Sequence, residues 1–448
     1  MTAARAFPPD EAVLGDMLDW TRARILSEPD PTDGALPLPI LDSRMGGSIT
    51  PGGIGSERAF RLFSEVIAPS TRPFGHPASL AFVASAPSPA ALGFDAVLGA
   101  AAIFAGNWDG GSGAIHAENQ ALRWLSDLAG WPEGAGGVFV SGGTLGNLSA
   151  MHAARVAWSE ANARPDRFRI LCSIEAHSSI AALARVMDAE LALVPTDARG
   201  RIDTAAAARF LAEDPSGIFA IVANAGATNC GAVDDISALA DLAGAHGLWL
   251  HVDGAYGLAA MADPSARPIF DGIERADSFI VDPHKWLFAP YDSCALVYRD
   301  AASATRAHGQ SAAYLDAVDD SVPNPSDMAL HLTRRARGLP LWFSLAAHGS
   351  GAYGRAIART RRIAREVAAG IEATPGLELI LGPQLTVILF RAPRLAGGAL
   401  AEWSEEHRRS GALLCLPTTW RGETVLRLCI VNPGTDPGEV MAVLRTAA

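Results

Sequence analysis

The sequence predicts an α/β protein whose main part is a mostly parallel sheet with helices on both faces. The chain has 448 residues, of which 49% are hydrophobic and 19% are charged, so it is long enough to bury more than one core. Between residues 85 and 300, short and nearly continuous apolar runs alternate with helical stretches. Such runs are typical of parallel strands that are buried on both faces, because the connecting helices cover them.

Residues 1–84 are expected to form an N-terminal arm that takes part in dimerisation. Helices are predicted near 10–26 and 56–67, and Gly and Pro are frequent enough between them to argue against a separate core. The apolar stretch at 89–106 is rich in Ala and Gly and contains Asp95. It indicates a buried helix and not a membrane span.

Residues 85–345 are expected to form the large domain. Its helix near 114–129 carries Ile115, Leu122 and Leu125 on one face, and a further helix is predicted over 236–245. The apolar runs predicted to be strands are 137–140, 169–172, 191–195, 218–223, 248–252, 278–281 and 294–298.

The alternation of strands and helices stops at residues 301–338. The acidic stretch 311–325 is predicted to be a long loop, which in a compact domain is usually functional. A smaller α+β domain is expected over 346–448. It would contain a long helix at 357–371, strands near 377–380, 386–390 and 425–430, and a final helix.

The charge and the cysteines exclude several classes of protein. A net charge of −12 argues against nucleic acid or an anionic membrane surface as partner. The five cysteines are scattered without a Cys-x-x-Cys pair, so neither a metal site nor a disulfide framework is expected. The N-terminus shows no apolar signal-peptide core, and a cytoplasmic protein is therefore expected.

Several chemically useful side chains follow directly after predicted strands. Ligands bind at the carboxyl ends of the strands in open parallel sheets, so these residues are expected to share one site. They are Ser141–Thr144, His177, Thr228, Asp253 and Lys285.

Lys285 is the only lysine in the chain, although Lys and Arg together number 36. Arginine cannot form a Schiff base, so a single retained lysine indicates covalent amine chemistry. Burial is expected to lower its pKa and leave a neutral amine. The alternative is a surface lysine that follows a turn at Pro283.

A glycine-rich segment at 141–147 leads from a strand into a helix. Glycines let the backbone approach an anion, and the N–H groups of the helix N-terminus suit a phosphate. The alternative is a tight turn in which Thr144 is an ordinary helix cap.

Three further residues have both a chemical and a structural interpretation. Asp253 ends a very apolar run and needs a positive partner, such as a protonated pyridine nitrogen, or else it caps a turn before Gly254. His177 at a strand end could face a ligand or cap a helix. Arg427 lies inside an apolar strand and should bind a carboxylate, either of a substrate or of the protein.

Together these residues resemble the group II amino-acid decarboxylases that depend on pyridoxal 5'-phosphate (PLP), such as the aromatic-L-amino-acid, glutamate and 2,4-diaminobutyrate enzymes. The resemblance covers residues from about 60 to 435 and implies fold-type I, PLP as cofactor, and a homodimer with its active site at the interface. The matching stretches are Gly-His-Pro at 75–77, Trp108, Ser-Gly-Gly-Thr at 141–144 with Asn147, Glu-Ala-His at 175–177, Thr228, His-Val-Asp-Gly-Ala at 251–255, Asp-Pro-His-Lys-Trp at 282–286, Thr-Arg-Arg at 333–335, and Leu-Arg-Leu at 426–428 with Asn432 and Pro433.

The resemblance also implies roles for individual residues. Lys285 would carry PLP as a Schiff base, Asp253 would hold its ring nitrogen protonated, and His177 would lie against the ring. The residues that would bind the cofactor are Gly143, Thr144, His177, Thr228, Asp253, Ala255, Asp282, His284, Lys285 and, from the other subunit, Gly349. The residues that would form the substrate pocket are Phe82, Val83, Ser85 and Trp108, to which we add Arg427.

The sequence departs from the family in ways that leave the product open. Gly106 lies where the aromatic enzymes carry a bulky ring, and no tyrosine lies near Pro325, where those enzymes place a proton donor. Tyr314 is the only tyrosine of that loop and is our candidate donor.

The expected reaction removes the α-carboxyl group of an L-amino acid and yields an amine. The alternatives are oxidative deamination to an aldehyde, another fold-type I lyase with Cys230 as the nearby thiol, and a non-enzymatic binding protein, which the retained Lys285 disfavours.

Overall fold

The computed structural model describes residues 10–309, 324–395 and 397–448. Its large sheet has seven strands in the order β1-β7-β6-β5-β4-β2-β3. Their bounds are β1 Gly136–Val140, β2 Phe168–Ser173, β3 Ala189–Val194, β4 Ile218–Asn224, β5 Trp249–Asp253, β6 Ser278–Val281 and β7 Cys294–Tyr298. Strands β3, β2, β4, β5 and β6 run parallel, whereas β7 is antiparallel to both β6 and β1. The predicted mostly parallel sheet is therefore confirmed.

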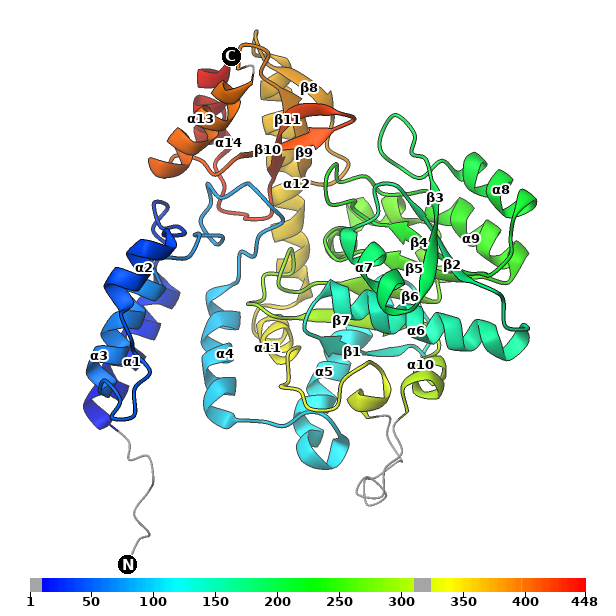
Figure 1. Ribbon diagram of the computed structural model, residues 1–448, viewed down its shortest axis with the longest axis horizontal. Coiled ribbons are helices and arrows are strands. Elements are labelled where there is room, and N and C mark those ends of the chain that lie inside the picture. The colour runs from blue at the N-terminus through cyan, green and yellow to red at the C-terminus, as the bar shows by residue number, and fades with distance from the viewer. Residues whose placement is uncertain (1–9, 310–323, 396) are drawn as a thin grey trace, which may run out of the picture.

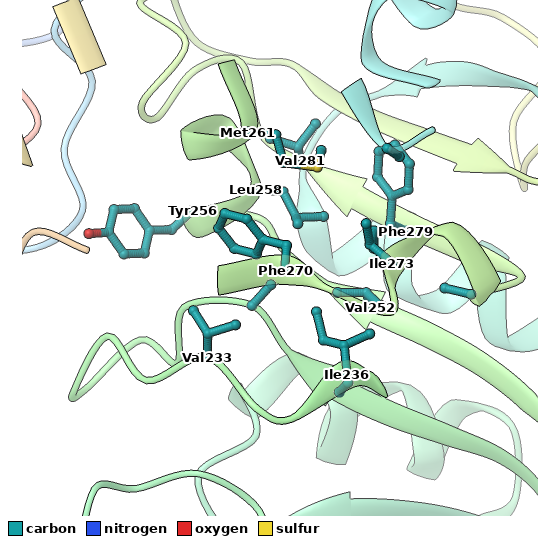
Figure 2. Close-up of a cluster of buried hydrophobic side chains, with 14 of the residues drawn as sticks. Val233, Ile236, Val252, Tyr256, Leu258, Met261, Phe270, Ile273, Phe279 and Val281 are labelled. Carbon is teal, nitrogen blue, oxygen red and sulfur yellow. The ribbon is translucent and has the colours of Figure 1, made fainter. Parts of the chain in front are cut away.

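Each face of the large sheet has its own hydrophobic core. Apolar side chains of α5 (Trp108–Leu128) and α9 (Ile236–His246) cover one face, and those of α6 (Gly143–Ala161) and α7 (Ser178–Val186) cover the other. Figure 2 shows part of the first core, where Val252 and Phe279 from neighbouring strands lie among side chains of the segments that follow. β4 is buried along its whole length, as expected of a central strand that helices cover on both sides.

A second, four-stranded antiparallel sheet lies beside the long helix α12 (Ser350–Glu372) in the C-terminal part of the chain (Figure 1). Its order is β10-β11-β9-β8, with β8 Glu378–Leu381, β9 Val387–Arg391, β10 Leu416–Trp420 and β11 Glu423–Cys429. Helices α12, α13 (Gly398–Arg409) and α14 (Pro437–Leu444) pack on it and form a separate core.

The N-terminal helices lie along the outside of the molecule (Figure 1). They are α1 (Glu11–Leu26), α2 (Leu38–Met45) and α3 (Ser56–Leu62), which continues as a π-helical turn at Phe63–Ile67. α4 (Pro89–Ala101) follows and packs against α11 (Leu339–His348). Several large apolar side chains of this arm are exposed, namely Leu14, Met17, Leu18, Leu26, Leu38, Ile40, Ile49, Phe63 and Ile67.

The remaining elements include one of the helices expected between strands and one helix that the sequence did not predict. α8 (Thr204–Glu213) precedes β4, α10 (Ala301–His308) lies where only irregular structure was expected, and short 3-10 helices occupy Gly257–Ala262, Pro264–Phe270, Ile273–Arg275, Pro325–Asp327 and Arg445–Ala447. The edge strand β10 was also missed. Within the described residues, no helix is both long and apolar enough to cross a membrane.

Candidate active site

A cavity of about 370 Å³ opens where five strands of the large sheet end. Its walls are the segments that follow β1, β2, β4, β5 and β6, together with one residue of β11 and two that precede α4. The lining residues are Phe82, Val83, Gly142, Gly143, Thr144, Asn147, His177, Asn224, Gly226, Ala227, Thr228, Asp253, Ala255, Tyr256, Asp282, His284, Lys285 and Arg427. The strand ends thus bring the predicted residues into one site.

Lys285 projects into this cavity from the turn between β6 and β7. Its Nζ lies 2.9 Å from Oδ2 of Asp282, a carboxylate whose side chain is 2% exposed. Burial favours the neutral amine, but attraction to Asp282 and the hydrogen bond to it outweigh burial, so the pKa of Lys285 is raised. The expectation of a lowered pKa was therefore wrong, because the sequence did not reveal that Asp282 turns back toward the amine.

The glycine-rich segment forms a helix start that no side chain caps. α6 begins at Gly143, and its N-cap is Gly142. The proposal that Thr144 is a plain helix cap is thus excluded, and the first N–H groups of α6 face the cavity without a side-chain partner.

Asp253 ends β5 and is 8% exposed. Its Oδ1 accepts a hydrogen bond from the backbone N–H of Ala255 at 3.2 Å, and its Oδ2 accepts one from the Asn147 amide at 2.9 Å. Asp253 therefore caps the turn before Gly254 and also presents its carboxylate to the cavity.

His177 is likewise both a helix cap and a cavity residue. Its Nδ1 accepts hydrogen bonds from the backbone N–H of Ser179 at 3.2 Å and from the Ser179 hydroxyl at 2.9 Å. A neutral imidazole that accepts at Nδ1 carries its proton on Nε2. The ring thus has a donor left for a ligand.

Arg427 faces the cavity without a carboxylate among the described residues. Its Nη2 and Nε donate to the carbonyls of Thr228 at 2.6 Å and Asn229 at 3.2 Å. A guanidinium has five N–H donors in a planar fork, so donors remain for an anion. The structural carboxylate partner considered from the sequence is not present in the described residues.

Some of the predicted site residues lie away from the cavity of this chain. Ser85 is buried and donates to the carbonyl of Ala289 at 2.9 Å, Trp108 begins α5, and Gly349 joins α11 to α12 with φ +76°. Tyr314 falls outside the described residues. The roles predicted for these four residues stay predictions.

Sequence reasoning assigned no role to several cavity residues. Asn224, Gly226, Ala227 and Tyr256 line the cavity as well, beside Gly142 and Asn147 of the predicted glycine-rich segment. Asn224 is the last residue of β4, so the argument from strand ends could have found it. Tyr256 could not be found in this way, because its hydroxyl pairs with Thr386, which is 130 positions away in the sequence.

The arrangement of these groups fits PLP. An amine is available to react with an aldehyde, a free helix start suits a phosphate, and a buried carboxylate suits a pyridinium nitrogen. Ala255 is small, and Gly142 has nothing within 4 Å of the position of a Cβ atom, so a flat ring and a phosphate have room. Lys285, Gly143, Thr144 and Asp253 are the residues that would hold it.

Comparison with known proteins leads to the same chemistry. A model of the family described as "Pyridoxal-dependent decarboxylase conserved domain" matches residues 60–393. The chain is 29% identical to the aromatic-L-amino-acid decarboxylase of Bacillus atrophaeus over 421 residues, which cover 90% of this chain and 87% of that protein. It is 31% identical to the L-2,4-diaminobutyrate decarboxylase of Rhizobium meliloti (strain 1021) over 388 residues, which cover 83% of this chain and 77% of that one.

The fold is shared with solved structures. The crystal structure of Oryza sativa TDC with PLP and tryptamine superposes on this chain with a TM-score of 0.89 at 23% identity, covering 99% of this chain and 98% of the other. Mouse CSAD gives a TM-score of 0.86 at 24% identity, covering 98% and 97%. The sheet order, the family match and these likenesses establish fold-type I. The chain belongs to the PLP-dependent group II decarboxylases and is a carboxy-lyase that acts on L-amino acids to give amines.

Proposed function

We propose that the cavity around Lys285, Asp253 and His177 is where this chain removes the α-carboxyl group of its amino-acid substrate. The observation that carries the proposal is the position of Lys285. The only lysine of the chain lies in the same cavity as Asp253 and the uncapped start of α6. No surface role for a lysine would require that placement.

When bound, PLP would supply an electron sink for the electron pair that the departing carboxyl group leaves behind. The residues of the chain would hold the cofactor, orient the substrate and neutralise their charges. Lys285 would hold the cofactor covalently, and Gly143 and Thr144 would donate hydrogen bonds to its phosphate. Asp253 would keep a proton on the ring nitrogen, because its buried carboxylate favours a positive partner.

The remaining cavity residues would place the substrate. His177 would donate from Nε2, and Arg427 would offer the free edge of its guanidinium to an anionic group of the substrate. Phe82 and Val83 form the apolar part of the wall. Relatives named for aromatic, diaminobutyrate and cysteine sulfinic acid substrates all match this chain, so the proposal is limited to the class of L-amino acids.

We also propose that two copies of the chain form a dimer and share their active sites. The exposed apolar side chains of the N-terminal arm support this, because such surfaces are usually covered by a partner. Trp108 and Gly349, which the family resemblance assigns to the site, lie outside the cavity lining of their own chain. The five cysteines are free and buried, which supports a reducing compartment such as the cytoplasm.

The proposal is tested on the purified protein. A panel of L-amino acids is incubated with the PLP-loaded enzyme, and amine, CO₂ and aldehyde are measured by mass spectrometry. Borohydride reduction should attach PLP to the peptide that contains Lys285. The Lys285→Arg variant keeps a cation but cannot form the covalent link, and we expect it to lose at least about 10⁴-fold in turnover. Wild-type turnover in Lys285→Arg, or PLP fixed to the N-terminal amine alone, would exclude the proposed site.

A further inference from the structure

A chain of buried hydrogen bonds leads from the sheet interior to both Asp253 and His177. Trp249 Nε1 donates to Ser278 Oγ at 2.8 Å, and Ser278 Oγ lies 2.8 Å from His251 Nδ1. His251 Nε2 lies 2.9 Å from Asn147 Oδ1. The Asn147 amide nitrogen then donates to Asp253 Oδ2 at 2.9 Å and to Ser179 Oγ at 3.0 Å.

The hydrogen bonds that Asn147 makes to Asp253 and Ser179 determine which atom donates and which accepts in each of the other bonds. Both N–H groups of Asn147 are used, one for the Asp253 carboxylate and one for Ser179, so its oxygen must accept from His251. A flipped amide would place this oxygen against the carboxylate, which is repulsive. His251 therefore carries its proton on Nε2, and its bare Nδ1 accepts from the Ser278 hydroxyl, whose oxygen accepts from Trp249.

The same argument applies to His177, the second cavity residue that this network contacts. Ser179 accepts from Asn147, so its hydroxyl proton is free to go to His177 Nδ1 at 2.9 Å. Together with the backbone N–H of Ser179, which donates to the same Nδ1, this hydroxyl favours the tautomer in which His177 presents an Nε2 proton to the cavity. One amide group, that of Asn147, thus sets the hydrogen-bonding state of two cavity residues.

Burial limits the alternatives to this arrangement. His251 and Ser278 are 0% exposed, and Asn147 is 1% exposed. Burial lowers the pKa of His251 to about 4, so the ring remains neutral and keeps one donor and one acceptor at neutral pH.

We propose that His251 is a positioning residue which, through Asn147, holds Asp253 and His177 in the states that receive the cofactor and substrate. We call the five hydrogen-bonded residues of this network the relay: Trp249, Ser278, His251, Asn147 and Ser179. His251 itself does not line the cavity and acts only through Asn147. The inference rests on the proposed roles of Asp253 and His177 and adds a residue that controls both.

The first experiment tests the relay through cofactor affinity. His251→Phe keeps an aromatic ring but leaves Asn147 Oδ1 without a donor, so the Asn147 amide loses its fixed orientation. We expect PLP to dissociate roughly tenfold more readily, because an unsatisfied buried partner is costly. His251→Gln can supply an N–H in its place and should recover most of the affinity. Trp131→Phe, which removes a buried indole donor to the Ile273 carbonyl in the core on the opposite face of the sheet, is the control and should leave the affinity unchanged.

A double-mutant cycle separates action through Asn147 from general damage. Once Asn147→Ala has removed the amide, adding His251→Phe should weaken PLP binding no further. Additive losses, or a loss in Trp131→Phe equal to that in His251→Phe, would overturn the relay. If the wild-type protein binds no PLP at all, the proposed function fails first, so the two failures are distinguishable.

A measurement on the unmodified protein covers the case in which His251→Phe does not fold. Nitrogen-15 NMR of the histidine rings, with His251 assigned by its absence in His251→Gln, reports which nitrogen carries the proton. We expect a protonated Nε2 and a bare Nδ1 at neutral pH. A proton on Nδ1 would reverse the chain of donors and overturn the proposal.

Discussion

The amine of Lys285 is subject to two opposing influences. Its place in the cavity favours the neutral form, whereas the Asp282 carboxylate at 2.9 Å favours the ammonium form, and the carboxylate prevails. His284, whose Nε2 lies 3.6 Å from the same oxygen of Asp282, shows the opposite balance, since burial lowers its pKa in spite of this carboxylate. The Lys285 amine is therefore held in its charged form before the cofactor binds.

Replacing Asp282 by Asn should release this charge. Because the raised pKa of Lys285 depends on the carboxylate, the pKa should fall in Asp282→Asn, and the neutral amine should appear at a lower pH. Lys285 is the only lysine, so the rate at which an amine-directed reagent labels it, followed against pH in the PLP-free protein, gives its pKa directly. A labelling profile that does not move would show that the ion pair does not control the amine.

The carboxylate of Asp253 should matter more for rate than for folding. Asp253→Asn would remove the counter-charge for the ring nitrogen, and the loss of a few kcal/mol of stabilisation costs several orders of magnitude in turnover. Asp234→Asn is the matched control. Its carboxylate is also buried, accepting from the N–H groups of Ile202 and Asn224 at the same edge of the sheet, but it does not line the cavity. Near-normal turnover in Asp253→Asn, measured at saturating PLP, would refute the assigned role.

At the scale of elements, one buried ion pair fixes the segment that returns from residue 324 to the large sheet. Arg334 donates to both carboxylate oxygens of Glu118 on α5 at 2.7 Å and to the carbonyl of Ala105 at 2.8 Å. Glu118 also accepts the backbone N–H of Gly338 at 2.7 Å, just before α11. The pair therefore joins α5, the turn before it and the start of α11.

Removing one partner of this pair should be strongly destabilising. Glu118→Ala leaves the guanidinium of Arg334 buried without a counter-charge, which typically costs about 3–5 kcal/mol of folding free energy. The exposed pair between Arg61 and Glu57 on α3 offers a comparison, and Glu57→Ala should change stability by less than about 1 kcal/mol. Urea unfolding of the three proteins measures the difference. Equal stabilities would show that the buried pair is not what holds α11 to α5.

The elements that the sequence predicts well are the strands of the large sheet that are buried on both faces. β4 to β7 appear within one or two residues of the predicted runs, because each is nearly continuous in apolar residues. β10 was missed because Pro417 and two threonines interrupt its pattern, and it lies at a sheet edge, where Pro is tolerated. α12 begins at Ser350, seven residues before its predicted start, because Gly351 and Gly354 weaken the helical signal and Gly354 meets the backbone of Ala262 closely.

The site was predictable as far as it depends on strand ends and on short motifs. Lys285, Asp253, His177 and Thr144 come together because parallel strands end at one edge. The relay was not predictable, because it joins residues of α6, β5 and β6 whose pairing depends on how these elements pack. The division of the chain near residues 84 and 345 stays a prediction.

For the whole molecule, the sharing of active sites between two chains is the prediction with the clearest test. Lys285→Ala and Gly349→Ala would each be nearly inactive if Gly349 completes the site of the partner subunit. A mixed dimer of the two variants would then contain one intact site. Random mixing should therefore recover roughly one quarter of wild-type activity, as the two-fold symmetry of a homodimer requires.

The mixing experiment has internal controls. Gly349 has φ +76°, so alanine strains the backbone wherever the residue acts, and the loss in Gly349→Ala alone is not diagnostic. The variants are mixed after mild denaturation and refolding, and each is also refolded alone. No recovery in the mixture, together with a dimeric mass by light scattering, would place Gly349 at the site of its own chain.

Because Lys285 is the only lysine of the chain, chemical labelling of its amine can count the active sites in a preparation. Every other basic side chain that could be mistaken for it is a guanidinium or an imidazole, and its own side chain is 25% exposed within the cavity. A fluorescent amine-directed dye should therefore bind at one internal position per polypeptide, apart from the N-terminal amine. The fraction of that position which PLP protects would report directly how many molecules in a preparation are loaded and competent.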